Sequence, residues 1–254
     1  MCIRDRNTFR HFELYFGVSG IGCVVNTVNP RLFPEQLTYI INHAENQYLF
    51  IDLSFVELVE SLESTFDSIK GFIILTDKEN MPDTALKNAI CYEDLIEKES
   101  EEFEWPDFDE NTASSLCYTS GTTGNPKGVL YSHRSTILHT WIVSSGNVAK
   151  VSSSSSILPV VPMFHVNAWG IPYAGAMFGA KLVFPGPALD GASIYELIDS
   201  EKPDLLMGVP TVWLGLLQYL NETNQTLECV DTALVGGAAA PRAMIQELFN
   251  NSVH

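Results

Sequence analysis

Basic residues are scarce in this chain. Its 254 residues include 14 Lys and Arg against 31 Asp and Glu, which gives a formal net charge of −17. The basic residues form no cluster, so the electrostatic footprint of a nucleic-acid-binding protein is missing, and no nucleic-acid partner is expected. Many of the acidic residues fall in one run from Glu93 to Glu110. Such a run predicts a solvated linker rather than an acidic field over the whole surface.

The chain also lacks a cysteine framework and an apolar membrane span. Its five cysteines are scattered and form no C-x-x-C or Cys/His pair of metal-site type, which favours a reducing, cytoplasmic setting. The stretch from Ile157 to Ala180 carries no formal charge, but it contains several prolines and glycines besides His165 and Asn167. Those residues argue against a lipid-facing helix. We therefore expect a buried α/β core segment and no transmembrane segment.

The first six residues, Met1 to Arg6, have neither the basic-then-apolar form of a signal peptide nor any cap or turn residues. We interpret residues 1–6 as a cloning or assembly scar and leave them out of the fold prediction. Residues 7–254 are then expected to form the folded domain.

Helical and strand patterns alternate along the rest of the chain, and 46% apolar residues can fill a sizeable core. Such alternation predicts an α/β fold in which mostly parallel strands are flanked by helices. Strands are expected at 48–51, 72–75, 116–118, 129–131, 157–161, 181–184, 205–209 and 232–235, and helices at 34–44, 55–62, 193–198, 212–219 and from Pro241 onward.

The most informative stretch is Tyr-Thr-Ser-Gly-Thr-Thr-Gly-Asn-Pro-Lys-Gly, from Tyr118 to Gly128, which connects two of the predicted strands. Its glycines let backbone N–H groups approach an anion, its hydroxyls can donate to phosphate oxygens, and Lys127 adds a positive charge. A flexible Gly/Ser/Thr turn is the simpler alternative. A Walker-type loop does not fit, because Pro126 and Gly128 stand where that motif needs Gly and Ser/Thr.

This stretch resembles, without a gap, the phosphate-loop signature of the adenylate-forming superfamily of acyl-CoA synthetases, luciferases and peptide-synthetase adenylation domains. The resemblance implies part of that fold's large N-terminal domain and a role for Thr119 at the phosphates and the Mg²⁺ shell. Lys127 would help to neutralise the phosphates. The residues implied to hold the β- and γ-phosphates are Ser120, Gly121, Thr122, Thr123 and Gly124.

A second motif, Pro-Met-Phe-His-Val-Asn-Ala-Trp-Gly, runs from Pro162 to Gly170. By themselves its histidine and tryptophan are typical core residues. The motif is similar to the carboxylate-site motif of superfamily members that activate fatty or other simple alkyl acids. The resemblance implies that His165 borders the reacting carboxylate and that Trp169 stands at the mouth of the acyl tunnel. The remaining residues implied to line the acyl pocket are Val166, Asn167, Gly208, Val209 and Pro210.

Two observations qualify these assignments. Residues 208–210 are explained equally well as a strand-to-helix turn, with Pro210 in the first helical turn. No acidic residue occurs between Leu158 and Leu189, which disfavours an amino-acid substrate.

A third motif is similar to the adenine-binding segment of the superfamily. It consists of the small residues Gly237, Ala238, Ala239 and Ala240 followed by Pro241. Small residues at a strand end also serve close packing, so the motif alone allows either interpretation.

The resemblance implies ATP-dependent activation of a carboxylic acid to an acyl-adenylate, followed by transfer to coenzyme A, with Mg²⁺ as the metal. Alternatives are the same chemistry on 3-methylmercaptopropionate or an aryl acid, and a nucleotide-binding module without catalysis. A homodimer is compatible with a full-length protein. Superfamily members continue past the last motif into a C-terminal domain, so this chain is expected to be an internal piece that forms no acyl-adenylate alone.

Overall fold

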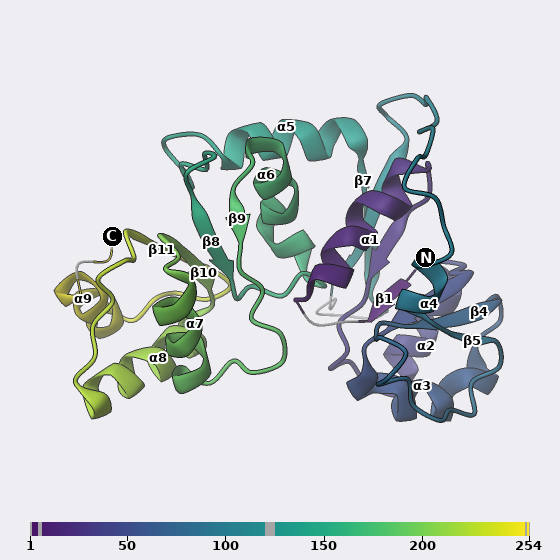
Figure 1. Ribbon diagram of the computed structural model, residues 1–254, viewed down its shortest axis with the longest axis horizontal. Coiled ribbons are helices and arrows are strands. Elements are labelled where there is room, and N and C mark those ends of the chain that lie inside the picture. The colour runs from purple at the N-terminus through teal and green to yellow at the C-terminus, as the bar shows by residue number, and fades with distance from the viewer. Residues whose placement is uncertain (1, 5–6, 120–124, 252, 254) are drawn as a thin grey trace. The chain divides into compact units, whose positions relative to one another are not determined.

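The structure is a computed structural model that describes residues 2–4, 7–119, 125–251 and 253. The chain divides into two compact units (Figure 1). The N-terminal unit comprises Met1–Arg6, Arg10–Thr136 and Phe164–Asn167, and the C-terminal unit comprises Asn7–Phe9, Ile137–Met163 and Ala168–His254.

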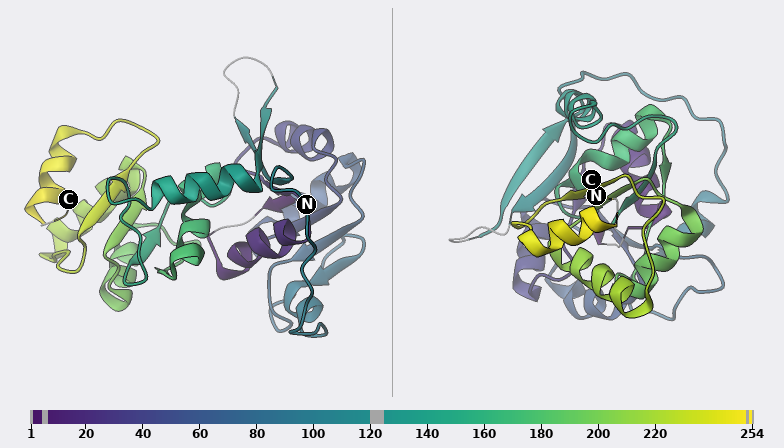
Figure 2. Two further views of the ribbon diagram at one scale, coloured as in Figure 1. Left: turned by 90° about the horizontal axis from the view of Figure 1, so that it is seen from above. Right: turned by 90° about the vertical axis from the view of Figure 1, so that its left-hand side faces the viewer.

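The N-terminal unit is built on a sheet whose described strands follow the order β5-β4-β3-β1-β2-β6-β7. All neighbours are parallel except β6 and β7, which pair antiparallel and run side by side in Figure 2. The segment between β6 and β7 is too short for the crossover that a parallel pair requires. The strands are β1 Cys2–Arg4, β2 Val25–Thr27, β3 Tyr48–Ile51, β4 Gly71–Ile74, β5 Ala89–Cys91, β6 Ala113–Thr119 and β7 Lys127–Ser132.

Strand β1 was not predicted, because residues 1–6 were set aside. Cys2–Arg4 pair in parallel with both β2 and β3, at the centre of the sheet.

Helix α2 shows how the sequence forms this unit. Pro34 occupies its first turn, and Leu37, Ile40 and Ile41 follow at helical spacing and are buried against the sheet strands β3 and β4. The other helical segments of the unit are α1 Phe9–Gly20, η1 Leu53–Phe55, α3 Val56–Leu62, η2 Glu63–Thr65 and α4 Tyr92–Ile96, with α2 itself spanning Pro34–His43.

The acidic run begins in α4 and continues as exposed, irregular chain to residue 112. It is attached to the unit by aromatic side chains. The Trp105 ring fills the space that a side chain at Gly20 would need, and Phe108 contacts His133. The predicted linker is therefore solvated but held against the N-terminal unit.

The C-terminal unit contains a parallel sheet with the strand order β11-β10-β8-β9. Its strands are β8 Ser156–Pro159, β9 Lys181–Leu182, β10 Leu205–Gly208 and β11 Thr232–Val235. Its helices are α6 Ile171–Phe178, α7 Gly191–Glu201, α8 Pro210–Thr223 and α9 Arg242–Asn250. The segments α5 His133–Val143 and η3 Val166–Gly170 each begin in the N-terminal unit and end in this one. Together the two sheets confirm the predicted α/β class with mostly parallel strands.

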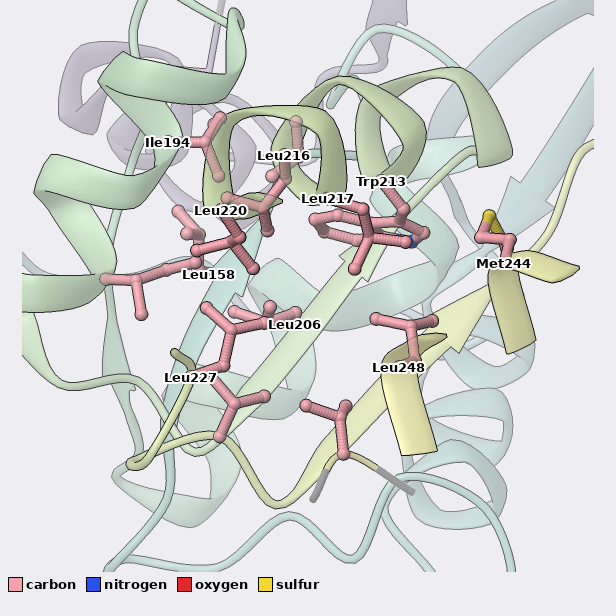
Figure 3. Packing of buried hydrophobic residues seen from close by; sticks show 14 of the residues in the cluster. Leu158, Ile194, Leu206, Trp213, Leu216, Leu217, Leu220, Leu227, Met244 and Leu248 are labelled. Atoms are coloured by element: carbon pink, nitrogen blue, oxygen red, sulfur yellow. The ribbon is translucent and has the colours of Figure 1, made fainter. Parts of the chain in front are cut away.

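The core of the C-terminal unit lies where α8 packs on the sheet (Figure 3). Trp213, Leu216 and Leu220 of α8 are buried with Leu158 of β8 and Leu206 of β10. Burying one such side chain contributes about 1.5–3 kcal/mol.

The uncharged stretch from residue 157 to 180 contributes β8, where a strand was predicted, and α6, which was not predicted. Ile157, Leu158, Ile171 and Ala174 are all fully buried. Within the described part of the chain, no helix combines the length and apolar character needed to cross a membrane.

Candidate active site

The phosphate loop begins and ends on paired strands. Thr119, the last residue of β6, lies opposite Lys127, the first residue of β7, and the Thr119 hydroxyl donates to the Lys127 carbonyl oxygen at 3.4 Å. Both side chains are exposed. The structure therefore brings together two of the predicted phosphate ligands at the base of the loop. The predicted ligands Ser120, Gly121, Thr122, Thr123 and Gly124 lie outside the described residues.

The strand that leads into the loop is held by a neighbouring helix. The Tyr118 hydroxyl and His43 Nδ1, at the end of α2, are hydrogen-bonded at 2.7 Å, and their rings meet edge to face. Gly128 lies opposite Tyr118 in the ladder, and a side chain there would come within 3.0 Å of Leu116 and 3.3 Å of the Tyr118 ring. No sequence pattern indicated that His43 contacts this strand, because it stands more than 70 residues from Tyr118.

His165 lies in the wall of a small pocket of the N-terminal unit. The pocket has a volume of about 140 Å³, and Thr119 and Pro126 from the two ends of the loop also line it. Its other lining residues are Thr27, Val28, Asn29, Leu32, Ile40, Tyr118 and Phe164. Pockets for drug-sized ligands are usually 300–1,000 Å³, so this one suits a single small group such as a carboxylate. The structure thus brings the predicted catalytic residues His165 and Thr119 to one pocket, whereas Lys127 lies outside its lining.

The residues after His165 form a left-handed helical turn. Val166, Asn167, Ala168 and Trp169 have φ values of 48°, 50°, 46° and 55°, and Gly170 follows at 80°. The turn sends neighbouring side chains in different directions: Val166 is exposed and Asn167 is buried. No signal in the sequence indicated this conformation, because none of the first four residues is glycine.

The Asn167 side chain is enclosed in the N-terminal unit. Its Nδ2 donates to Ser115 Oγ at 3.0 Å, and its Oδ1 accepts from Tyr15 Oη at 3.1 Å and from Cys117 Sγ at 3.3 Å. Cys117 Sγ also lies 3.3 Å from Thr27 Oγ1. Burial raises the pKa of the Cys117 thiol, which keeps it protonated and able to donate.

In the C-terminal unit, predicted acyl-pocket and adenine residues gather where β10 and β11 end. Gly208 ends β10, and its carbonyl oxygen accepts from Gly236 N just beyond β11. A side chain at Gly237, where φ is +78°, would come within 3.1 Å of Val209 Cγ1, and the Trp169 indole covers Gly236. In open parallel sheets, ligands bind outside the carboxyl ends of the strands. This edge is therefore the expected location for a nucleotide or acyl group.

The residues of the predicted adenine segment, which lies at this edge, have small side chains that cover little of the backbone. Gly237, Ala238, Ala239 and Pro241 are exposed, and Ala240 packs partly against the core. Pro241 precedes the first residue of α9 as its N-terminal cap position. An exposed backbone with small side chains offers a flat surface to a base.

Gly208, Val209 and Pro210 also have a structural role. Pro210 begins α8, Val209 is its cap position, and the fully buried Trp213 ring leaves no room for a side chain at Gly208. The strand-to-helix turn expected from the sequence is therefore present at these residues.

Thr119 and a bound phosphate could together hold Mg²⁺. Among the described residues, no group of three or more His, Cys, Asp or Glu could hold a metal ion. Mg²⁺ is commonly bound by substrate phosphates, waters and one or two protein oxygens. The exposed Thr119 hydroxyl, placed at the base of the phosphate loop, is one such oxygen.

Sequence comparison decides the family. The model of the AMP-binding enzyme family matches residues 2–253. The chain belongs to this family.

Curated members of the family include a medium-chain-fatty-acid–CoA ligase of Ectopseudomonas oleovorans, 50% identical over 245 residues, which are 96% of this chain and 45% of the relative. A 3-methylmercaptopropionyl-CoA ligase of Ruegeria lacuscaerulensis is 50% identical over 239 residues, 94% of this chain and 44% of the relative. The chain thus spans less than half the length of either relative.

Among solved structures, an anthranilate–CoA ligase in complex with anthranoyl-AMP superposes with a TM-score of 0.85 at 21% identity. The match covers 99% of this chain and 48% of the ligase. At this identity the match shows the fold alone, and it agrees with the N-terminal part of an adenylate-forming enzyme expected from the sequence.

Proposed function

We propose that this chain supplies the phosphate-binding and carboxylate-binding parts of an AMP-forming acid–CoA ligase that acts on a fatty or other alkyl acid. The observation that carries the proposal is the pocket shared by His165 and Thr119. It unites the motif assigned to the carboxylate with the motif assigned to the phosphates, although the two stand 46 positions apart in the chain.

In the first step a carboxylate oxygen attacks the α-phosphorus of ATP, the bond to the bridging oxygen breaks, and pyrophosphate leaves with the electron pair. Lys127 neutralises the negative charge of the phosphates, which would otherwise repel the incoming carboxylate, and the Thr119 hydroxyl orients them. His165 hydrogen-bonds the carboxylate and orients it. Thr119 would hold Mg²⁺ together with the phosphates, and the ion would supply further charge neutralisation.

In the second step the thiol of coenzyme A attacks the acyl carbon of the acyl-adenylate, and AMP leaves. Water competes for the same carbon, so the site has to be dry. By the family resemblance, that apolar cover is assigned to the Trp169 indole, which packs on Gly236 within the C-terminal unit. The adenine is assigned to the small-residue segment from Gly237 to Pro241. No nucleophilic side chain is required in either step.

The sequence supports an uncharged acyl chain. A substrate ammonium would need a carboxylate partner, and the stretch from Leu158 to Leu189 offers none. The second candidate is a short thioether acid, because the relative named for 3-methylmercaptopropionyl-CoA is as similar to this chain as the relative named for medium-chain acids.

Stable analogues of the acyl-adenylate test the proposal with the chain as it is. We would measure the affinity of the chain for sulfamoyl adenosine carrying an octanoyl, a 3-methylthiopropionyl or a benzoyl group, and for the unacylated compound. Intermediate analogues bind far more tightly than substrates, on the order of 100-fold or more. We expect the octanoyl or 3-methylthiopropionyl compound to bind most tightly. Equal binding of all four compounds would refute a carboxylate and acyl site and favour a nucleotide-binding module.

ATP–pyrophosphate exchange is the complementary assay. It follows the reversible formation of the acyl-adenylate directly. The scattered cysteines support a cytoplasmic location. A homodimer of a full-length protein stays a prediction for sedimentation analysis.

A further inference from the structure

The left-handed turn from Val166 to Gly170 is an unfavourable conformation for this sequence. L-residues visit left-handed helical space singly, because Cβ approaches the following carbonyl oxygen, and β-branched residues such as Val166 do so least of all. Four consecutive non-glycine residues nevertheless adopt it. Such a turn persists only where surrounding contacts hold it in place.

Asn167 makes the contacts that hold the start of the turn, Val166 and Asn167, in the N-terminal unit. Its side chain is 7% exposed, and both its amide nitrogen and its amide oxygen are hydrogen-bonded. The partners Ser115 and Cys117 lie on β6, the strand that ends at Thr119, and Tyr15 lies on α1. The start of the turn is thereby attached to the strand that carries the phosphate loop.

The hydrogen bonds around Asn167 also connect to residues that line the Thr119 pocket. Thr27, which lines it, is hydrogen-bonded to Cys117, and His165 stands two residues before Asn167. The Asn167 side chain itself is absent from the pocket lining.

We propose that Asn167 is a positioning residue, whose buried amide holds the left-handed turn and so fixes His165 in the wall of the Thr119 pocket. Asparagine suits this place for two reasons. Its amide supplies a donor for Ser115 and an acceptor for Tyr15 and Cys117 at once. It also tolerates left-handed backbone better than most residues do. The family resemblance implied that Asn167 contacts the acyl group directly. We assign to Asn167 an indirect role instead, in which it acts through His165. The role of His165 rests on the proposed function.

The test follows the imidazole of His165 by NMR in protein labelled at histidine, with the resonance assigned from His165→Gln. Asn167→Ala should move the His165 resonance and broaden it, because the turn loses its fixed conformation. The resonance of His43 should stay in place, since its partner Tyr118 is untouched.

Asn46→Ala is the matched control. Asn46 is 2% exposed in the same unit, donates to the Ile41 carbonyl oxygen and accepts from Asn26. Both alanine variants should lower the melting temperature, but only Asn167→Ala should move His165. An unmoved His165 resonance in Asn167→Ala, or an equal shift in Asn46→Ala, would overturn the proposal.

Milder variants keep the test decisive if Asn167→Ala fails to fold. Tyr15→Phe and Ser115→Ala each remove one hydrogen bond to Asn167 and leave its side chain in place. Each should shift His165 in the same direction by a smaller amount, and the absence of any shift in both would contradict the proposal.

Relief of the backbone strain gives an independent readout. Glycine adopts positive φ without steric cost, so Val166→Gly added to Asn167→Ala should restore part of the melting temperature and return His165 toward its original resonance. Failure of Val166→Gly to restore either quantity would show that the left-handed turn is not what Asn167 maintains.

Affinity for the acylated sulfamoyl adenosine separates this proposal from the proposed function. If the unsubstituted chain binds it, Asn167→Ala should weaken binding on the order of 10-fold or more, because a small displacement of a positioned group is costly. If the unsubstituted chain does not bind it, the proposed function fails, whereas the NMR comparison still decides the role of Asn167.

Discussion

Trp169 and Gly236 are in such close contact that a side chain at position 236 would come within 2.7 Å of the indole ring. The two residues come from different motifs, since Trp169 belongs to the carboxylate motif and Gly236 immediately precedes the adenine segment. The glycine is needed for the packing of an aromatic ring, and not for a special φ value.

Gly236→Ala should therefore displace the Trp169 ring. We expect a loss of about 1–3 kcal/mol in the free energy of unfolding, typical of overpacking, and a shift of the tryptophan emission toward longer wavelength. Denaturant titration and fluorescence measure both effects. The matched control is Gly215→Ala in α8, where nothing lies within 4 Å of the new methyl group. Because alanine favours helix, that variant should gain up to about 1 kcal/mol.

Lys127→Ala should weaken the binding of MgATP. Lys127 is the charged side chain assigned to the phosphates, and hydrogen bonds to charged groups contribute enough for a change of about 10-fold to 100-fold. Isothermal titration calorimetry at two salt concentrations would also show a smaller salt dependence in the variant. Lys70→Ala, which removes an exposed lysine bonded to Gln47 in the same unit, should leave the affinity unchanged. Equal affinities for the two variants would exclude Lys127 from the phosphate site.

Cys117 predicts a dependence of stability on alkaline pH. Burial raises its pKa above the ordinary value of 9.0, so the folded chain holds this proton at a pH where the unfolded chain releases it. Its contribution to stability is complete below about pH 9 and is lost as the pH rises through the folded-state pKa. Denaturant midpoints between pH 8 and pH 10.5 should fall less steeply in Cys117→Ala. Cys229→Ala, which removes a half-buried thiol with a raised pKa, should flatten the profile less.

Leu206→Ala should test the core of the C-terminal unit. Leu206 is fully buried under α8, and removing such a side chain costs about 2–5 kcal/mol because a cavity remains. Leu214→Ala on the same helix removes a side chain that is 44% exposed and should change stability by about 0.5 kcal/mol or less. A similar loss in both variants would show that α8 does not pack as described.

Elements with regular apolar spacing were predictable. The helix that begins at Pro34 and the strand from Thr232 to Val235 were found where their patterns placed them. Helix α1 was missed because its buried face includes His11, Tyr15 and Ser19, so it shows no clean apolar stripe. Strand β9 ends at Leu182, two residues earlier than predicted, because strand ends depend on the neighbouring strand rather than on local pattern.

The motifs of the candidate site could be found from sequence, but the contacts that hold them could not. The Thr119 and His165 motifs carry recognisable residues, whereas the partners of Asn167 come from α1 and β6, far from it in the chain. Asn7 is a further example: its side chain bonds the Pro159 and Val161 carbonyl oxygens and the Met163 N–H. A single buried amide that joins distant segments leaves no periodic pattern in the sequence.

The pairing of Thr119 with Lys127 limits how the phosphate loop can vary. The sheet fixes both ends of the connection, so insertions between them would change loop length without moving its anchors, and doubling the length would cost only about 0.6 kcal/mol of closure entropy. A one-residue slip of β7 would instead turn Lys127 to the opposite face of the sheet. For the stability of the fold, a change of length is thus tolerated inside the connection, whereas a change of register in the strand that follows it is costly.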